Sequence, residues 1–173
     1  FSSAAVFGSP QTSDLLDGEM PLGAYKAFMP AFDAEFDDLA ELGTRPVTHL
    51  VTDAAMLTPR IELLLAAGHT AGDLMALVED SDVLFAGDLC FFGVTPLAFQ
   101  GDPAVWADVL DTLGDLASVI VPGHGPVGGD EDVRELATYL RHCVAGSIPP
   151  GAWDSWPGRD PRDYEFKVYS QWG

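Results

Sequence analysis

The sequence of 173 residues predicts one domain of the α+β class, in which strands and helices are mixed. Short continuous apolar runs predict buried strands at residues 61–66, 74–78 and 83–86. Apolar residues that recur at steps of three and four predict amphipathic helices at 103–116 and 130–144. A core built from both kinds of element is therefore expected.

The first part of the chain adds shorter elements. Residues 3–7 predict a strand, after which Ser9 is a typical N-cap and Pro10 fits the first position of a short helix. A longer amphipathic pattern covers 24–42, and Pro30 is expected to kink or divide this helix.

The connections between the strong elements follow from local signals. Residues 47–52 are expected to be extended, and 54–57 to begin a turn. The polar tetrad at 79–82 separates two apolar runs and predicts a tight hairpin. Asp102 is the expected cap of the helix that follows it, and 117–121 is expected to be a strand.

The domain is expected to cover residues 1–145. Residues 146–173 are rich in Trp, Pro and Gly, and we expect an irregular tail packed on the same domain. We find no internal repeat and no low-complexity tract.

Composition narrows the classes of function. Hydrophobic residues make up 47% of the chain and charged residues 20%, as in a globular protein, and the formal net charge is −19. So acidic a surface repels phosphates and anionic lipid, which excludes nucleic acid and membrane as expected partners. The two cysteines form no CxxC pair, and no signal-peptide pattern or long apolar run is present. A reduced, cytoplasmic setting is the expectation.

Three stretches share one design: an apolar run ends, glycines open the backbone, and a side chain able to bind metal follows. These side chains are His69, Asp88 and His124. Loops at strand ends are where a rigid sheet presents functional side chains. Neutral imidazoles and an ionised carboxylate are the ligands of hydrolytic zinc sites, so the pattern predicts a metal centre.

The same stretches resemble the metallo-β-lactamase superfamily. Gly68-His69-Thr70-Ala71-Gly72-Asp73, Leu84-Phe85-Ala86-Gly87-Asp88 and Val121-Pro122-Gly123-His124-Gly125 are similar to three of its motifs, in the family's order. The resemblance implies an αββα two-sheet sandwich, of which mainly the C-terminal half is present. It also implies that His69 binds a first metal ion, that Asp88 bridges two ions and that His124 binds the second. Zinc is the expected metal, and iron or manganese would also suit these ligands.

The family's first motif, His-x-His-x-Asp-His, is absent from the chain. The resemblance places that motif, with the remaining ligands and the catalytic residues, upstream of Phe1. The upstream half, or another copy of the chain, is accordingly expected to complete the fold. The implied activity is metal-dependent hydrolysis of an ester, thioester or lactam-type bond in a small molecule.

Several neighbours of the three ligands have expected roles. Thr70 and Asp73 would hold the His69 loop or orient the ligands. Phe91 and Phe92 would line a substrate pocket or pack as a loop. Cys90 is expected to be a buried structural cysteine, with a thiolate ligand as the alternative.

Two other functions compete with hydrolysis. Residues 123–128 match GxGxxG after a strand and before a helix, which predicts a turn that binds a dinucleotide in an NAD-linked oxidoreductase. Against it, no acidic residue ends a second strand about 20 residues later. The second alternative is a truncated or degenerate relative that serves as a binding or assembly subunit, and the absent first motif is its support.

Overall fold

A computed structural model describes residues 3–18, 22–28, 33–38, 44–94, 96 and 101–146. They belong to two compact units, one ending at Leu50 and the other beginning at Val51. No helix within these ranges is long and apolar enough to cross a membrane. Residues 147–173, the expected tail, lie outside the described part of the chain.

In its described residues, the first unit holds one small pair of strands and three short helices. Strand β1 (Phe7–Gly8) pairs in parallel with β2 (His49–Leu50). The predicted cap of α1 (Pro10–Leu16) is confirmed, since the Ser9 side chain accepts a hydrogen bond from the Thr12 amide. Two helices, α2 (Leu22–Phe28) and α3 (Asp33–Asp38), replace the single pattern predicted at 24–42, on either side of Pro30.

The second unit contains a five-stranded sheet in the order β3-β4-β5-β6-β7. The strands are β3 (Ala55–Thr58), β4 (Ile61–Ala66), β5 (Asp73–Val78), β6 (Val83–Phe91) and β7 (Val119–His124). All neighbours pair antiparallel except β6 and β7, which are parallel and are joined through helix α4 (Pro103–Leu113). The turn expected at 54–57 is wrong, because β3 forms there by pairing with β4.

The hairpin predicted between β5 and β6 is confirmed. A short 3-10 turn, η2 (Glu79–Ser81), ends at Asp82, whose φ of 55° is left-handed. The Asp82 carboxylate accepts hydrogen bonds from the amide and the hydroxyl of Ser118, and its carbonyl accepts one from Val119. The hairpin is thereby tied to the start of β7.

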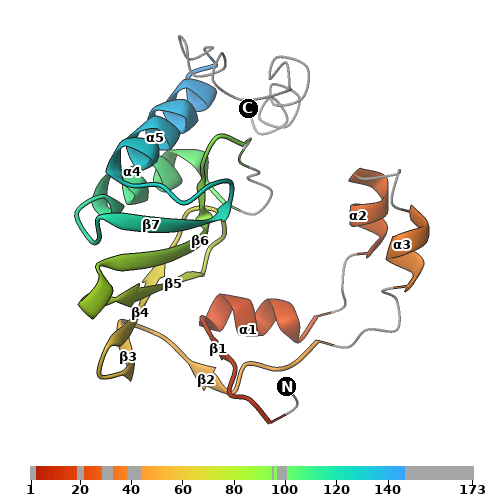
Figure 1. The fold of residues 1–173 in the computed structure, drawn as a ribbon. Helices are drawn as coiled ribbons and strands as arrows, with labels where there is room; N and C mark the ends of the chain where they lie inside the picture. The colour runs from red at the N-terminus through yellow and green to blue at the C-terminus, as the bar shows by residue number, and fades with distance from the viewer. Residues whose placement is uncertain are drawn as a thin grey trace. The chain divides into compact units, whose positions relative to one another are not determined.

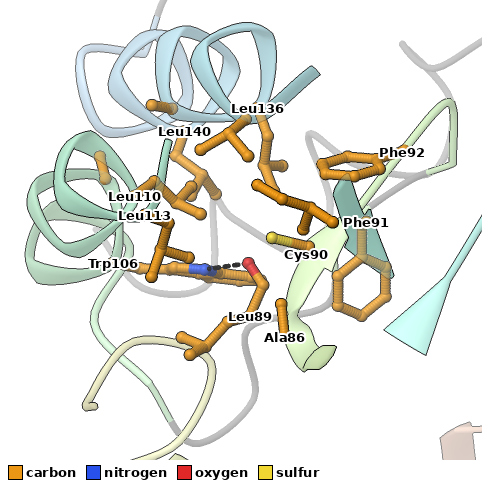
Figure 2. Packing of buried hydrophobic residues seen from close by; sticks show 14 of the residues in the cluster. Ala86, Leu89, Cys90, Phe91, Phe92, Trp106, Leu110, Leu113, Leu136 and Leu140 are labelled. Atoms are coloured by element: carbon orange, nitrogen blue, oxygen red, sulfur yellow. Dashed lines mark hydrogen bonds between the residues drawn. The ribbon is translucent and has the colours of Figure 1, made fainter. Parts of the chain in front are cut away.

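Helices α4 and α5 (Asp130–Val144) cover one face of this sheet (Figure 1). The Asp102 side chain caps α4 as predicted, accepting from the Ala104 and Val105 amides. Between helices and sheet lies the main apolar core, part of which Figure 2 shows. The fully buried Trp106 donates its indole N–H to the Leu89 carbonyl at 2.9 Å, which fixes α4 to β6.

The opposite face of the sheet is also apolar. Strand partners point to the same face, and the ladder on this side carries Leu63, Ala76 and Phe85. Val83 and Val119, which are partners in the pairing of β6 with β7, lie on the same face. Phe85 is 48% exposed and Val119 is 37% exposed. The sheet therefore has one face under the helices and one partly open apolar face.

Candidate metal centre

The structure brings His69, Asp88 and His124 together at one end of the sheet. His69 lies in the turn between β4 and β5, Asp88 lies near the end of β6, and His124 ends β7. The Nε2 atom of His69 lies 3.7 Å from Oδ2 of Asp88, and Nε2 of His124 lies 3.6 Å from Oδ1. Each carboxylate oxygen thus faces a different imidazole.

These separations suit metal ligands better than hydrogen bonds. They exceed the usual N–H···O range, which ends near about 3.2 Å. Two atoms that each bind one tetrahedral zinc ion at about 2.1 Å lie about 3.4 Å apart. In the described ranges, no three His, Cys, Asp or Glu side chains converge as one complete metal site. The three residues instead form two pairs that share Asp88, and each pair offers two donors.

The turn that carries His69 is held by its own side chains. The Asp73 carboxylate accepts hydrogen bonds from the Thr70 amide, at 3.0 and 3.1 Å, and from the Thr70 hydroxyl at 2.5 Å. The Gly72 amide donates to the same hydroxyl, and the Gly68 amide donates to the Thr70 carbonyl. Thr70 and Asp73 are thus placed to brace the loop, while their orientation of the ligands stays a prediction.

Asp88 faces outward because the strand is irregular just before it. Gly87 has a φ of 56°, a left-handed conformation that favours glycine, and the pairing of β6 with β7 shifts register there. The Asp88 side chain is 47% exposed, whereas Cys90 is fully buried. Burial raises the pKa of the Cys90 thiol to about 12, as expected for a buried structural cysteine.

Gly123 leaves the space that the Asp88 carboxylate occupies. A Cβ at position 123 would overlap Oδ1 of Asp88 and would lie 2.8 Å from the carbonyl carbon of Gly87. The glycine of the third stretch therefore serves a close approach between β7 and β6.

Two aromatic rings lie against the histidines, a role that the sequence pattern did not predict. The Phe91 ring stacks on His124, with centroids 4.5 Å apart and planes at 17°, and lies 5.6 Å from the His69 ring. Trp106 meets His69 edge-on at 5.4 Å and Phe91 at 6.0 Å. Helical spacing predicted Trp106 as a core residue, but no local signal indicates which rings meet a histidine.

Phe91 and Phe92 are 3% and 2% exposed and belong to the core. Phe91 ends strand β6, and the two rings point in different directions (Figure 2). Their predicted contact with a substrate stays a prediction.

One ring nitrogen of His69 lacks a hydrogen-bond partner. Its Nδ1 is buried and has no hydrogen-bond partner among the described residues. If Nε2 binds a metal ion, Nδ1 carries the proton and normally donates it to an acceptor. The remaining two histidines lie elsewhere: His49 is exposed in β2 and stacks on Phe7, and His142 lies in α5.

The GxGxxG stretch at 123–128 does join a strand to a helix. However, the first turn of α5 carries Asp130, Glu131 and Asp132. A dinucleotide pyrophosphate would meet three carboxylates where that fold normally offers a positive helix end. The electrostatics of this turn disfavour a dinucleotide.

No protein-family model matches the chain. Among solved structures, the DIM-1 metallo-β-lactamase aligns with a TM-score of 0.59 and 16% identity, over 80% of this chain and 58% of its own. A metallo-β-lactamase from Pontibacter korlensis aligns at 0.54 and 20%, over 80% and 58%. FIM-1 from Pseudomonas aeruginosa, in a mono-zinc form, aligns at 0.51 and 20%, over 71% and 61%. The chain has part of the metallo-β-lactamase fold.

The predicted α+β class and the partial metallo-β-lactamase fold are therefore confirmed. At identities of 20% or less, these similarities establish the fold and leave the activity open. The chain spans 58% of the length of DIM-1 and of the Pontibacter korlensis enzyme. The roles of His69, Asp88 and His124 as metal ligands stay predictions, supported by the distances between their side chains.

Proposed function

We propose that the protein is a metal-dependent hydrolase acting on an ester, thioester or lactam-type bond in a small molecule. One observation carries the proposal. Asp88 lies between two imidazoles and directs one carboxylate oxygen to each, at separations of 3.6 and 3.7 Å. A shared carboxylate between two nitrogen donors is the arrangement that a two-metal hydrolytic site needs.

In this proposal His69 and Asp88 would hold one ion, and His124 and Asp88 would hold the other. Zinc is the metal we favour, because imidazole and carboxylate suit it and because FIM-1 was solved in a mono-zinc form. When bound, zinc supplies a Lewis acid and a water of lowered pKa. The chain's own part is to position the donors on rigid strand ends.

Each proposed ion has two donors here, whereas zinc usually takes four ligands. We infer that an upstream segment or another copy of the chain supplies further donors and the catalytic residues. The open apolar face of the sheet supports this inference, because exposed apolar surface of this kind marks an interaction site.

The test is metal binding by the natural polypeptide, with any upstream segment included. After zinc supplementation and dialysis, elemental analysis should find zinc bound. Asp88→Ala should lose affinity for both ions by at least about 100-fold, more than changes outside the ligand shell cause. His124→Ala should lower the affinity for one of the two ions. Asp108→Ala is the matched control, since Asp108 is an aspartate on α4 with a side chain 82% exposed.

The results also separate the alternatives. Hydrolysis of ester or lactam substrates that disappears with chelators supports an enzyme, whereas zinc binding without turnover would favour a binding or assembly subunit. Protein that holds no zinc after supplementation contradicts the proposal. Saturable NAD binding that survives removal of metal would support the GxGxxG reading instead.

A further inference from the structure

The ring of Phe91 contacts both His69 and His124, the two histidines among the proposed ligands. It lies in the parallel ladder between β6 and β7, where Phe91 is the partner of His124. The Phe92 amide donates to the His124 carbonyl at 3.0 Å, which fixes the two backbones at this point. The two rings therefore emerge side by side from paired strands, and the stack at 4.5 Å and 17° follows from that pairing.

Phe91 is itself held in place. Its side chain is 3% exposed, and its ring makes a T-shaped contact with Trp106, with the ring centroids 6.0 Å apart. Trp106 is anchored by its hydrogen bond to the Leu89 carbonyl. A fixed backbone acceptor, an indole and a phenyl ring thus form a continuous support behind the imidazoles.

The two histidines use this support unequally. The His69 side chain is 18% exposed and touches both Trp106 and Phe91. The His124 side chain is 54% exposed, and the aromatic contact recorded for it within the described residues is the one with Phe91. An exposed imidazole without such a contact would sample several rotamers and would lose that freedom on binding an ion.

We propose that Phe91 is a positioning residue, which holds the His124 imidazole toward Asp88 and supports His69 to a smaller degree. This inference rests on the proposed metal centre. Its physical content is preorganisation: the stack fixes the direction of Nε2 before the ion arrives, so that less entropy is lost on binding.

The experiment uses the histidine resonances of the natural polypeptide, with any upstream segment included, and residues 1–173 contribute four of them. In protein labelled with ¹⁵N-histidine, the ring protons of His124 should be shifted upfield by the Phe91 ring current, without any metal. Zinc titration should then perturb His69 and His124. In Phe91→Leu the upfield shift should vanish, and the Kd reported by His124 should rise about tenfold or more, with a smaller rise at His69.

Phe91→Tyr keeps the ring and should restore both readouts. Leu110→Val and Leu110→Ala are the controls, because Leu110 is 1% exposed in the same core but lies on α4. One removes less and the other more of the same core side chain, so their stabilities should lie above and below that of Phe91→Leu. Thermal unfolding measures the stability of each variant. Phe91→Met, whose flexible side chain adapts to irregular core space, replaces the leucine variant if that one does not fold.

The outcomes are distinct. An equal change of zinc affinity in Phe91→Leu and the Leu110 variants would overturn the inference and leave the metal centre standing. The absence of a ring-current shift on His124 in the wild-type protein would overturn it without any variant. Wild-type imidazoles that do not respond to zinc would refute the proposed function, and the positioning role with it.

Discussion

At the level of single residues, the proposed metal centre depends on Gly123, which has no side chain to bind an ion. Gly123 lets the Asp88 carboxylate rest against the β7 backbone, and an added methyl group would overlap it and crowd the Gly87 carbonyl carbon at 2.8 Å. Because backbone atoms are involved, rotation of one side chain does not relieve the overlap.

Gly123→Ala is therefore expected to destabilise the fold by about 1–3 kcal/mol and to weaken zinc binding at the same time. Urea unfolding and zinc competition with a chelator measure the two effects. Gly23→Ala is the control, since nothing lies within 4 Å of the added methyl group. Equal stability of the two variants would show that β7 does not approach Asp88 as described.

The two cysteines should differ in reactivity. Burial raises the pKa of Cys90 to about 12, so its thiolate is scarce near pH 8. Cys143 is partly exposed on α5. We expect a disulfide reagent to modify Cys143 rapidly in the folded protein and Cys90 only on unfolding. Peptide mapping identifies the site, and rapid native labelling of Cys90 would contradict the burial.

The sequence allowed the three proposed ligands to be chosen, because glycine-flanked His and Asp residues after apolar runs are a local signal. Phe91 and Trp106 carry no comparable signal. Their contact with the histidines arises from strand pairing and from the docking of α4, and both are tertiary events. Side-chain partners of this kind depend on how strands distant in the sequence pair, and local sequence patterns do not show that pairing.

At the level of elements, the Asp82 turn joins the β5–β6 hairpin to β7. Hydrogen bonds from the Ser118 hydroxyl and amide lower the pKa of the Asp82 carboxyl. A carboxyl group whose pKa is lower in the folded state stabilises the fold above its unfolded pKa of about 3.9, and this contribution is lost as pH falls through the folded value.

Ser118→Ala should consequently reduce the loss of stability that occurs between pH 7 and pH 3. Urea midpoints of wild type and variant at both pH values measure this difference. Ser81→Ala is the control, because the Ser81 hydroxyl donates to the Val78 carbonyl, which does not titrate. If the pH dependence is unchanged in Ser118→Ala, the hydrogen bond between Ser118 and Asp82 does not contribute to the loss of stability at low pH.

The elements differ in how well local patterns predicted them. Strand β4 and helix α5 have the predicted bounds, since each is a strongly apolar or amphipathic run. Strand β3 was missed because its exposed residues, such as Met56, follow no alternation, and pairing with β4 defines it. Strand β6 continues to Phe91, past the left-handed Gly87 that suggested an end.

For the molecule as a whole, the open apolar face of the sheet has a measurable consequence. Phe85 is 48% exposed there, and a soluble monomer rarely leaves such a face uncovered. Expressed alone, residues 1–173 should therefore self-associate or bind an apolar dye. Phe85→Lys should shift the mass in sedimentation toward the monomer.

Val105→Lys is the matched control, since Val105 is 45% exposed but lies on helix α4. It should leave the association unchanged. A wild-type monomer at all concentrations, with a sharp cooperative thermal transition, would contradict the proposal that an upstream half or a second copy covers this face.

The crossover through α4 also has a consequence for the order of folding. Strands β3 to β6 form an antiparallel meander of local contacts, whereas β7 must close a long loop to pair with β6. His69 and Asp88 can thus meet early on the folding pathway, and His124 arrives late. The ion assigned to Asp88 and His124 is then expected to slow unfolding while leaving the rate of folding almost unchanged.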